Sequence, residues 1–194
     1  MFKGLKKLIR LVVAVFLIYV LYMVVLFLFP VKYSDVVEEY AQKSGVEKNL
    51  IYGIIKAQSG FDENALSNKG AIGLMQLKAD TAKWCADKMG EPFEEQDLKD
   101  PRTNIKIGVW YLSYLKDELK SQDLAIIAYN AGISHVKKWI DDGKIDEKVS
   151  VPDNIPFEET RKYIKKVRLY EKVYMFIGKT QKIRSVVDEY TGVK

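Results

Sequence analysis

The stretch LIYGIIKAQSGF, residues 50–61, predicts a helix that ends at a polar residue in an unusual place. Its apolar Ile51, Ile54 and Ile55 recur at the spacing of one helix face. Gln58 follows Ile54 by four residues and therefore lies on the same inward face, just before a Ser-Gly pair that ends the helix. An uncharged amide at this point is either a satisfied polar group of the core or the position of a group with a chemical task.

The sequence on both sides of this stretch predicts a mostly α-helical domain. Apolar residues recur at helical spacing in successive segments, and Gly45 and Gly90 supply helix ends. The expected helices cover residues 35–45, 46–60, 81–89, a long segment around 105–115, and then 124–132, 134–143, 158–176 and 183–190. We expect an irregular loop at residues 61–77, which are rich in Asn, Ser and Gly, and a short strand at residues 147–151.

An apolar run of 19 residues, Leu11–Phe29, precedes this domain and contains no charge, Gly or Pro. As a helix it would be roughly 28 Å long, close to the hydrocarbon thickness of a bilayer. No acidic residue occurs before Asp35, and four basic residues precede the run: Lys3, Lys6, Lys7 and Arg10. This pattern is typical of a membrane-spanning helix.

A cleaved signal peptide shares the basic start, but its apolar core is typically about 7–15 residues long and ends at a small-residue cleavage site. The exit here, LFLFPVKYSD, has no such site. We therefore expect an uncleaved signal anchor in residues 1–30, which contacts the membrane through residues 11–29, and a domain in residues 31–194. The basic residues predict a cytoplasmic N-terminus and an extracytoplasmic domain.

The net charge of +5 reflects this topology more than the domain. Removing the four basic residues at the start from the 31 of the whole chain leaves 27, against 26 acidic residues. The domain has no strongly basic balance and no stripe of Arg and Lys interleaved with aromatic residues. Nucleic acid is therefore not an expected partner.

The chain holds one cysteine and one histidine, Cys85 and His135. This excludes an intramolecular disulfide, a Cys-based metal site and multi-His metal ligation. Cys85 is expected to be a small buried apolar residue, with a reactive thiol as the alternative. A Ser-His-Asp hydrolase would have to use His135, yet no Gly-x-Ser-x-Gly motif accompanies it; we expect a histidine at the surface or at a helix end.

Two segments combine glycine with polar residues: GAIGLMQ at 70–76 and AYNAG at 128–132. Glycine permits tight backbone close to a ligand. Gln76, Tyr129 and Asn130 supply hydrogen bonds and an aromatic face, as a carbohydrate cleft requires. Taken singly, each segment is better explained as an ordinary turn whose polar residues are buried caps.

Taken together and in order, five motifs resemble the lysozyme-like soluble lytic transglycosylases of bacterial cell-wall metabolism. They are QS at 58–59, SNKGAIGLMQ at 67–76, DPRTNIKIGVWYL at 100–112, AYNAG at 128–132 and IPFEETRKYI at 155–164. The resemblance covers roughly residues 50–167. It implies a mostly α, lysozyme-like helical domain with a groove for a peptidoglycan glycan strand, and no cofactor. Together with the apolar run, it predicts a place at the bacterial cell membrane.

The sequence departs from this family at Gln58, where the family has a glutamate. That carboxyl is understood to protonate the glycosidic oxygen between N-acetylmuramic acid and N-acetylglucosamine. It then takes a proton from the muramoyl C6 hydroxyl, which attacks C1 and leaves a 1,6-anhydro product. Burial would keep such an acid protonated near neutral pH, whereas an amide cannot deliver the proton. We expect the chain to bind glycan and to cut it poorly or not at all.

The resemblance also implies a set of residues that contact substrate. Ser67 is expected near the C6 hydroxyl, Gln76 and Asn130 near N-acetyl or hydroxyl groups, and Tyr129 around the sugar. Glu159 is expected to help build the cleft through Tyr163 or bound sugar, and Met75 to be wall or packing. The full set is Ser59, Ser67, Met75, Gln76, Tyr129, Asn130, Glu159 and Tyr163. The helically spaced Trp84, Trp110, Tyr111 and Tyr114 are expected to be core rather than sugar platforms.

Three functions stay open. The first is a membrane-anchored lytic transglycosylase in which Gln58 is a deliberate isosteric substitution, and the second is a hydrolytic muramidase of the same fold, separable by its reducing product. The third is a natural, non-catalytic scaffold that holds glycan, or proteins of cell-wall synthesis, division or secretion. The short linker after the apolar run favours membrane-proximal glycan in each case.

Overall fold

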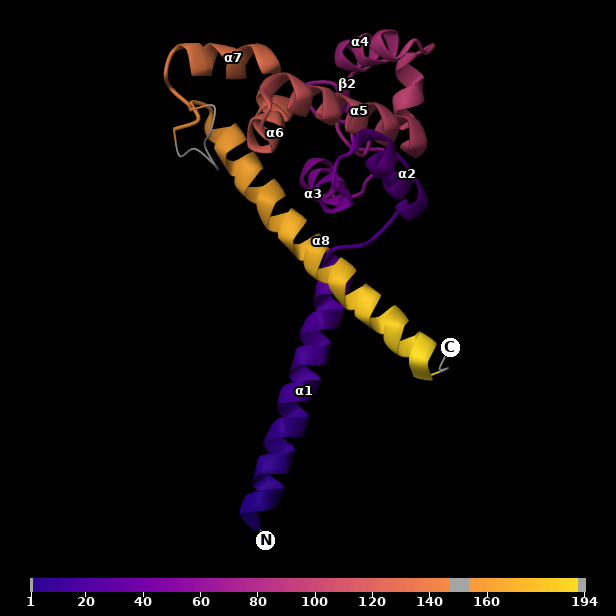
Figure 1. Cartoon of the computed structure of the whole chain (residues 1–194), viewed down its shortest axis with the longest axis vertical. Coiled ribbons are helices and arrows are strands. Elements are labelled where there is room, and N and C mark those ends of the chain that lie inside the picture. Colours follow the sequence, from indigo (N-terminus) through magenta and orange to yellow (C-terminus); the bar gives the residue numbers. More distant parts are fainter. Residues whose placement is uncertain (1, 147–153, 192–194) are drawn as a thin grey trace. The chain divides into compact units, whose positions relative to one another are not determined.

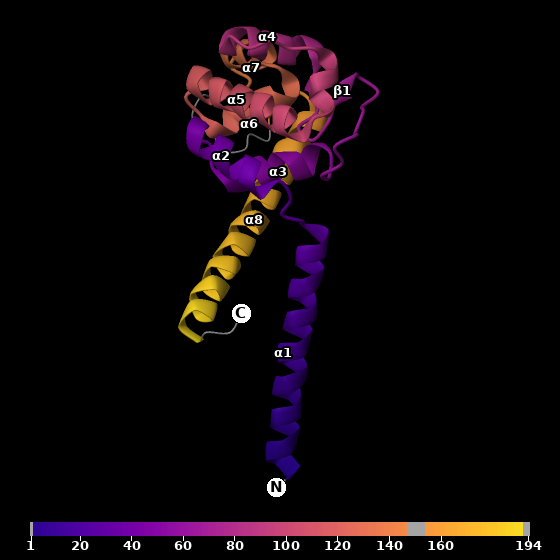
Figure 2. The ribbon, with the colours of Figure 1, turned by 90° about the vertical axis from the view of Figure 1, so that its right-hand side faces the viewer.

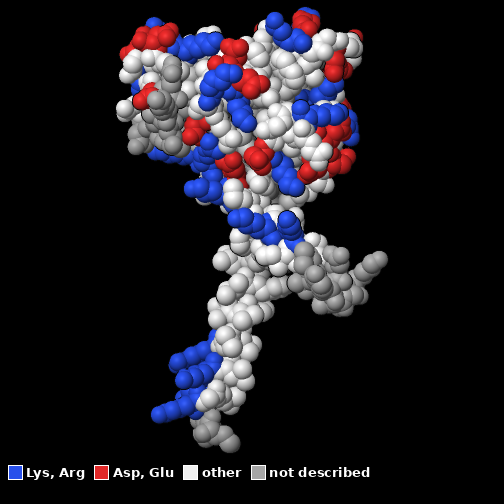
Figure 3. Space-filling view, viewed as in Figure 1, with Lys and Arg blue, Asp and Glu red and all other residues white. Residues whose placement is uncertain are grey.

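The chain divides into two units, Met1–Val31 and Lys32–Lys194, and the computed structural model describes residues 2–146 and 154–191 of them. The first unit is a single helix, α1 (Phe2–Leu28). Figure 3 shows it as a largely uncharged rod with Lys and Arg side chains gathered toward one end. Its segment Lys3–Leu28 is long and apolar enough to cross a membrane.

The second unit is mostly helical, as predicted (Figures 1 and 2). Its elements are α2 (Ser34–Ser44), α3 (Lys48–Gln58), β1 (Ala71–Ile72), β2 (Leu77–Lys78), α4 (Ala79–Met89), the 3-10 helix η1 (Glu95–Lys99), α5 (Pro101–Leu119), α6 (Gln122–Ala131), α7 (Ile133–Asp141) and α8 (Glu158–Thr191). Several ends follow from local sequence. The Asp100 carboxylate accepts from the backbone N–H of Thr103 at the start of α5, and Gly45 and Gly90 adopt left-handed conformations after α2 and α4.

Two expectations about local structure were wrong. Residues 61–77 are not wholly irregular, because β1 and β2 pair antiparallel with Ala71 opposite Lys78. The two helices expected at 158–176 and 183–190 are one continuous helix, α8. The residues between them do not break it, because they include no proline, and Gly178 costs a helix only about 1 kcal/mol relative to Ala. The strand expected at 147–151 lies outside the described residues.

The core forms where α8 packs against α3 and α6, and where α5 packs against α6 and α2. Residues 124–128 of α6 are buried in full. The approach of α3 to α8 is close: a Cβ added at Gly53 would lie 3.0 Å from the backbone nitrogen of Glu171 and 3.1 Å from the carbonyl oxygen of Val167. This packing fixes the end of α3, and with it Gln58, against the first turns of α8.

Candidate active site

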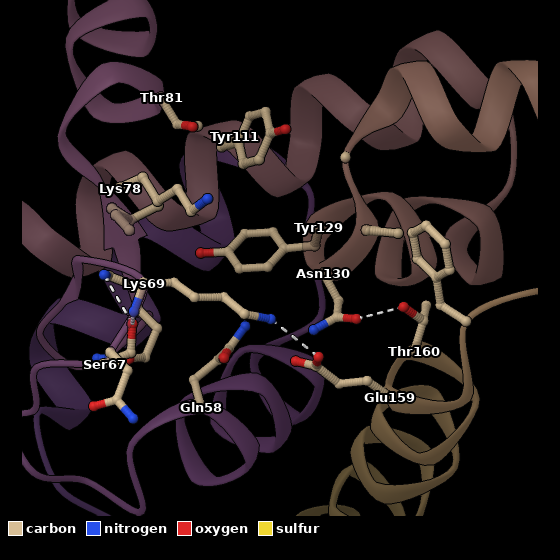
Figure 4. A pocket seen from close by; sticks show the side chains of 17 residues that line it. Gln58, Ser67, Lys69, Lys78, Thr81, Tyr111, Tyr129, Asn130, Glu159 and Thr160 are labelled. Atoms are coloured by element: carbon tan, nitrogen blue, oxygen red, sulfur yellow. Dashed lines mark hydrogen bonds and ion pairs between the residues drawn. The ribbon is translucent and has the colours of Figure 1, made fainter.

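A cavity of about 590 Å³ opens beside the end of α3 (Figure 4). Segments far apart in the sequence line it: the end of α3, residues 67–78, the end of α6 and the start of α8. The lining residues are Gln58, Ser67, Asn68, Lys69, Ala71, Gln76, Leu77, Lys78, Thr81, Tyr111, Tyr129, Asn130, Ala131, Gly132, Phe157, Glu159 and Thr160. The volume lies in the range of ligand pockets.

Gln58 is the last residue of α3 and its side chain is partly exposed to the cavity. Ile54 and Ile55, one turn earlier, are fully buried. The amide nitrogen donates to the hydroxyl oxygen of Tyr163 at 3.1 Å. Burial raises the pKa of Tyr163, so that its hydroxyl stays neutral. Gln58 therefore stands at the boundary between core and cavity, in contact with a hydroxyl that can accept or donate.

Residues 67–76 form a tightly bonded turn along one side of the cavity. The Ser67 hydroxyl oxygen accepts from the backbone N–H of Ala71 at 2.9 Å and of Lys69 at 3.2 Å. Gln76 has a left-handed backbone (φ 50°), which is uncommon outside glycine. Its amide nitrogen donates to the carbonyl oxygens of Ala65 at 3.1 Å and Gly73 at 3.0 Å. Both N–H donors of Gln76 are thus used, and its carbonyl oxygen is the group left to meet a ligand.

Asn104, on α5, holds this turn from behind. It is buried and uses both ends of its amide: the oxygen accepts from the backbone N–H of Met75 at 2.8 Å, and the nitrogen donates to the carbonyl oxygens of Ile72 at 3.0 Å and Leu98 at 2.9 Å. Gly73 lies against the Asn104 amide and has φ 76°. A Cβ added at Gly73 would approach the carbonyl oxygen of Leu98 to 2.7 Å. This role of Asn104 was not predicted from the sequence, although the residue lies in one of the five motifs.

Three residues expected to contact substrate do not line the cavity. One is Tyr163, which is buried and accepts a hydrogen bond from Gln58, and the other two are Met75 and Ser59. Met75 is fully buried, and its side chain occupies the space that a Cβ on Gly108 would take. The Ser59 hydroxyl donates to the carbonyl oxygen of Leu74 at 2.9 Å and accepts from the backbone N–H of Phe61 at 3.1 Å. The structure places both behind the cavity, where they fix the backbone that surrounds it.

The end of α6 forms the side of the cavity that faces the turn of residues 67–76. The Tyr129 hydroxyl donates to the Met75 carbonyl oxygen at 3.0 Å, and burial raises its pKa well above the ordinary value. The Asn130 amide oxygen accepts from the hydroxyl of Thr160 at 2.6 Å, so the amide nitrogen is directed to the cavity (Figure 4). Thr160 is a buried polar residue that was not predicted as part of the site.

Charged side chains meet over the cavity. The Lys69 ammonium lies 3.2 Å from the Glu159 carboxylate, which joins the turn to the first turn of α8 (Figure 4). Both side chains are exposed, so this pair adds little stability. Glu159, expected beside Tyr163, pairs with Lys69, and Tyr163 is the partner of Gln58. Among the lining residues Glu159 is the single carboxylate.

The aromatic residues of α4 and α5 pack largely as expected. Trp84 and Tyr114 form an edge contact with ring centroids 4.9 Å apart, and Trp110 stacks on Tyr114 at 5.8 Å. Tyr111 differs from the others because it also lines the cavity, 5.5 Å from the ring of Tyr129. An aromatic face is therefore present in the cavity at a residue expected only in the core.

The single cysteine and the single histidine, both in the described part of the chain, offer no second chemistry. Cys85 is buried, and desolvation raises its pKa to about 12, so the thiol is not activated. His135 is exposed near the start of α7, as expected. Within the described part of the chain, no group of three or more His, Cys, Asp and Glu residues is arranged to hold a metal ion.

Among known protein families, residues 35–150 match the one described as "Transglycosylase SLT domain". The chain is 33% identical over 153 residues to a soluble lytic murein transglycosylase of Escherichia coli, covering 76% of this chain and 24% of that protein. It is 32% identical over 168 residues to a membrane-bound lytic murein transglycosylase C of Yersinia enterocolitica, covering 74% of this chain and 46% of that protein.

Solved structures give the same picture. An inactive Glu-to-Gln mutant of the lytic transglycosylase Slt from Pseudomonas aeruginosa matches with a TM-score of 0.70 and 35% identity, covering 80% of this chain and 25% of that one. The 70-kDa soluble lytic transglycosylase in complex with bulgecin A matches with a TM-score of 0.71 and 31% identity, covering 79% and 25%. This chain spans about a quarter of these soluble relatives and just under half of the membrane-bound relative.

Proposed function

The chain belongs to the SLT transglycosylase family and has its lysozyme-like helical fold, and from this premise we propose that it is a peptidoglycan lytic transglycosylase whose acid/base position is Gln58. The observation that carries the proposal is the placement of Gln58. It ends α3, faces the cavity and touches one polar group, the Tyr163 hydroxyl. A carboxyl in its place would meet both the apolar end of α3 and the open cavity.

The proposed reaction needs that carboxyl twice. It donates a proton to the glycosidic oxygen between N-acetylmuramic acid and N-acetylglucosamine as the bond to C1 breaks. It then accepts the proton of the muramoyl C6 hydroxyl, whose oxygen forms a bond to C1 and closes the 1,6-anhydro ring. The cavity supplies neutral polar groups around this centre: the carbonyl oxygen of Gln76, the amide nitrogen of Asn130 and the hydroxyl of Ser67.

The amide at position 58 removes the acid and the base together. General acid–base assistance typically contributes about 10²–10⁴-fold, so the chain as it stands should bind glycan and barely cleave it. A related Slt enzyme with Gln in place of Glu is described as inactive. Glu159 is no replacement for the acid, because its exposed carboxylate is paired with Lys69.

The proposed location is the outer face of the bacterial cell membrane. An apolar N-terminal helix and membrane-bound relatives support membrane association. The four basic residues before the apolar run favour a cytoplasmic N-terminus, with residues 31–194 on the other side of the membrane. Residues 29–33 then hold the domain near the membrane, where membrane-proximal glycan is the substrate within reach.

Digestion of isolated peptidoglycan by the full chain in detergent, with products read by mass, tests the proposal. We expect Gln58→Glu to release 1,6-anhydromuropeptides and the unchanged chain to release almost none. Asn64→Asp, which adds a carboxylate at an exposed residue outside the cavity, is the matched control.

Each other outcome identifies a different function. Reducing products from Gln58→Glu would indicate a muramidase and contradict the transglycosylase proposal. Binding of glycan by both forms without cleavage would favour the membrane-tethered scaffold.

A further inference from the structure

The outer face of α8 carries an apolar series that no part of the described chain covers. Leu169, Phe176 and Ile183 follow one another at intervals of seven residues. Their side chains are 59%, 52% and 64% exposed. Along the helix axis they extend over about 21 Å. Single exposed apolar residues are common on protein surfaces, whereas an aligned series of them is not.

Lysines occupy the same face between these apolar residues. Lys165, Lys172 and Lys179 are exposed and also recur every seven residues. The combined order 165, 169, 172, 176, 179 and 183 alternates steps of four and three, which keeps all six residues on one side of a helix. We call these six residues the outer stripe of α8.

Core packing does not explain the outer stripe, because the core lies on the other side of the helix. Val167, Tyr174 and Ile177 are buried there, and Gly53 of α3 lies against the α8 backbone at Val167 and Glu171. The helix therefore has two opposite apolar faces. In both ribbon views its C-terminal part (yellow) also extends beyond the other helices of the domain (Figures 1 and 2).

The charge of residues 165–183 indicates which kind of partner the outer stripe would bind. Between residues 165 and 183 the one acidic residue is Glu171. Its carboxylate is engaged by Arg168 at 2.6 Å and by Gln122 at 3.3 Å, away from the outer stripe. An apolar series flanked by lysines suits an anionic lipid surface, where apolar side chains enter the interface and lysine stems reach the head groups. Two copies paired through this stripe would instead bring lysines together.

The membrane is also within reach. Helix α1 ends at Leu28 and α2 begins at Ser34. The five connecting residues, 29–33, span at most about 18 Å when fully extended. With α1 inserted, the domain stays next to a lipid surface, and even weak contacts are then favoured by the high local concentration.

We propose that the outer stripe of α8 docks on anionic lipid head groups of the membrane that α1 spans, so that the catalytic domain lies on the bilayer in a fixed orientation. The inference rests on the proposed anchoring by α1 and is independent of the chemistry at residue 58. It adds a second membrane contact to the first, and sets which way the cavity faces.

The test uses the full chain in nanodiscs, with a fluorophore on a cysteine introduced by Ile183→Cys. Gln181→Cys is the matched control, because Gln181 is exposed on the opposite side of the same helix. The native Cys85 is buried and stays unlabelled. We expect a lipid-borne quencher to reduce fluorescence at position 183 and not at 181, and more strongly in anionic than in zwitterionic discs.

Removing Lys172 and Lys179 by substitution with Gln should lower the ratio of docked to free domain about 25-fold, at about fivefold for each lysine. Equal quenching at 183 and 181, or quenching at 183 that ignores lipid charge and both lysines, would overturn the proposal. Disulfide formation between two unlabelled Ile183→Cys chains under mild oxidation, with no lipid quenching of the labelled chain, would assign the outer stripe to self-association. Quenching at 183 alongside a failed glycan digestion would retain this proposal and reject the catalytic one.

Discussion

Two sides of the cavity are built in opposite ways. On one side, the turn of residues 67–76 is held by buried Asn104, whose amide makes three hydrogen bonds to backbone groups. On the side where α3 ends against α8, Gln58 makes one hydrogen bond, to Tyr163, and Glu159 meets Lys69 of the turn in solvent. We call the turn side the fixed side, because saturated buried hydrogen bonds hold its geometry. We call the side of Gln58 and Glu159 the variable side, because its groups stay available to a ligand.

This difference explains how an amide can occupy position 58 without disturbing the fold. The Tyr163 hydroxyl accepts a hydrogen bond from an amide and can donate one to a carboxylate. An exchange between Gln and Glu therefore keeps a partner in either form. The same exchange at Gln76 has no such freedom, because both acceptors there are backbone carbonyl oxygens.

The largest expected effect comes from making the same change, Gln to Glu, on each of the two sides. Gln58→Glu should raise the rate of glycan cleavage by about 10²–10⁴-fold, because it restores a general acid and base. Gln76→Glu adds a carboxylate to the same cavity but should give no gain, and should lower the melting temperature because it loses two donors. Initial rates on isolated peptidoglycan and thermal unfolding measure both. Equal cleavage rates for the two variants would contradict the assignment of the acid/base position to residue 58.

The next effect concerns the fixed side alone. Asn104→Ala leaves the Met75 N–H and the carbonyl oxygens of Ile72 and Leu98 unpaired in the interior. Since each such group costs about 1–3 kcal/mol, we expect the free energy of unfolding to fall by about 3 kcal/mol or more. Urea unfolding measures it, with exposed Asn64→Ala as the control. A loss below about 0.5 kcal/mol, the range of ordinary surface changes, would show that the turn is held by something else.

A pH effect should come from the packing behind the fixed side. Burial raises the pKa of Cys85 to about 12, so its thiol ionises in the unfolded chain before it does in the folded one. The stabilising contribution is full below the unfolded pKa of about 8.5 and is lost as the pH rises from there toward 12. Over this window the unfolding free energy should fall about 1.4 kcal/mol per pH unit more steeply than in Cys85→Ala. Parallel slopes would indicate an exposed thiol.

The smallest effect tests the contact on the variable side. In the Gln58→Glu background, Tyr163→Phe removes a donor to the introduced carboxylate, worth about 1 kcal/mol or a fivefold fall in rate. Because that bond favours the ionised form, its loss raises the pKa of the carboxyl. The alkaline limb of the pH–rate profile, which reports the protonated acid, should then move to higher pH. An unmoved limb would mean that Tyr163 acts only through packing.

The sequence predicted the segments that line the cavity better than the packing that supports them. The helical face before Gln58, the two polar segments around the cavity and the motif at the start of α8 could be inferred from spacing and from the resemblance. Asn104 could not, because its bond to Met75 joins residues 29 positions apart and depends on how α5 packs behind the turn. Ser59 was placed in the cleft because it stands in a motif, whereas its hydrogen bonds assign it to the support. Met75, expected as wall or packing, is fully buried packing.

Short and long elements were missed for different reasons. Strands β1 and β2 contain two residues each, too few to show an alternating pattern. Helix α8 was divided because the polar residues 179–182 resemble a break, yet one continuous helix passes through them. Its outer stripe escaped notice because apolar residues on two opposite faces blur the usual periodicity of an amphipathic helix.

The most direct test of the central claim is a crystal structure of the chain as it stands, soaked with an intact peptidoglycan oligosaccharide. With an amide at position 58 the substrate should survive. We predict an unbroken strand in the cavity with a glycosidic oxygen about 3 Å from the Gln58 side chain, the reach of a proton donor. A strand bound away from Gln58, or no strand in this cavity, would contradict the claim that residue 58 occupies the acid/base position.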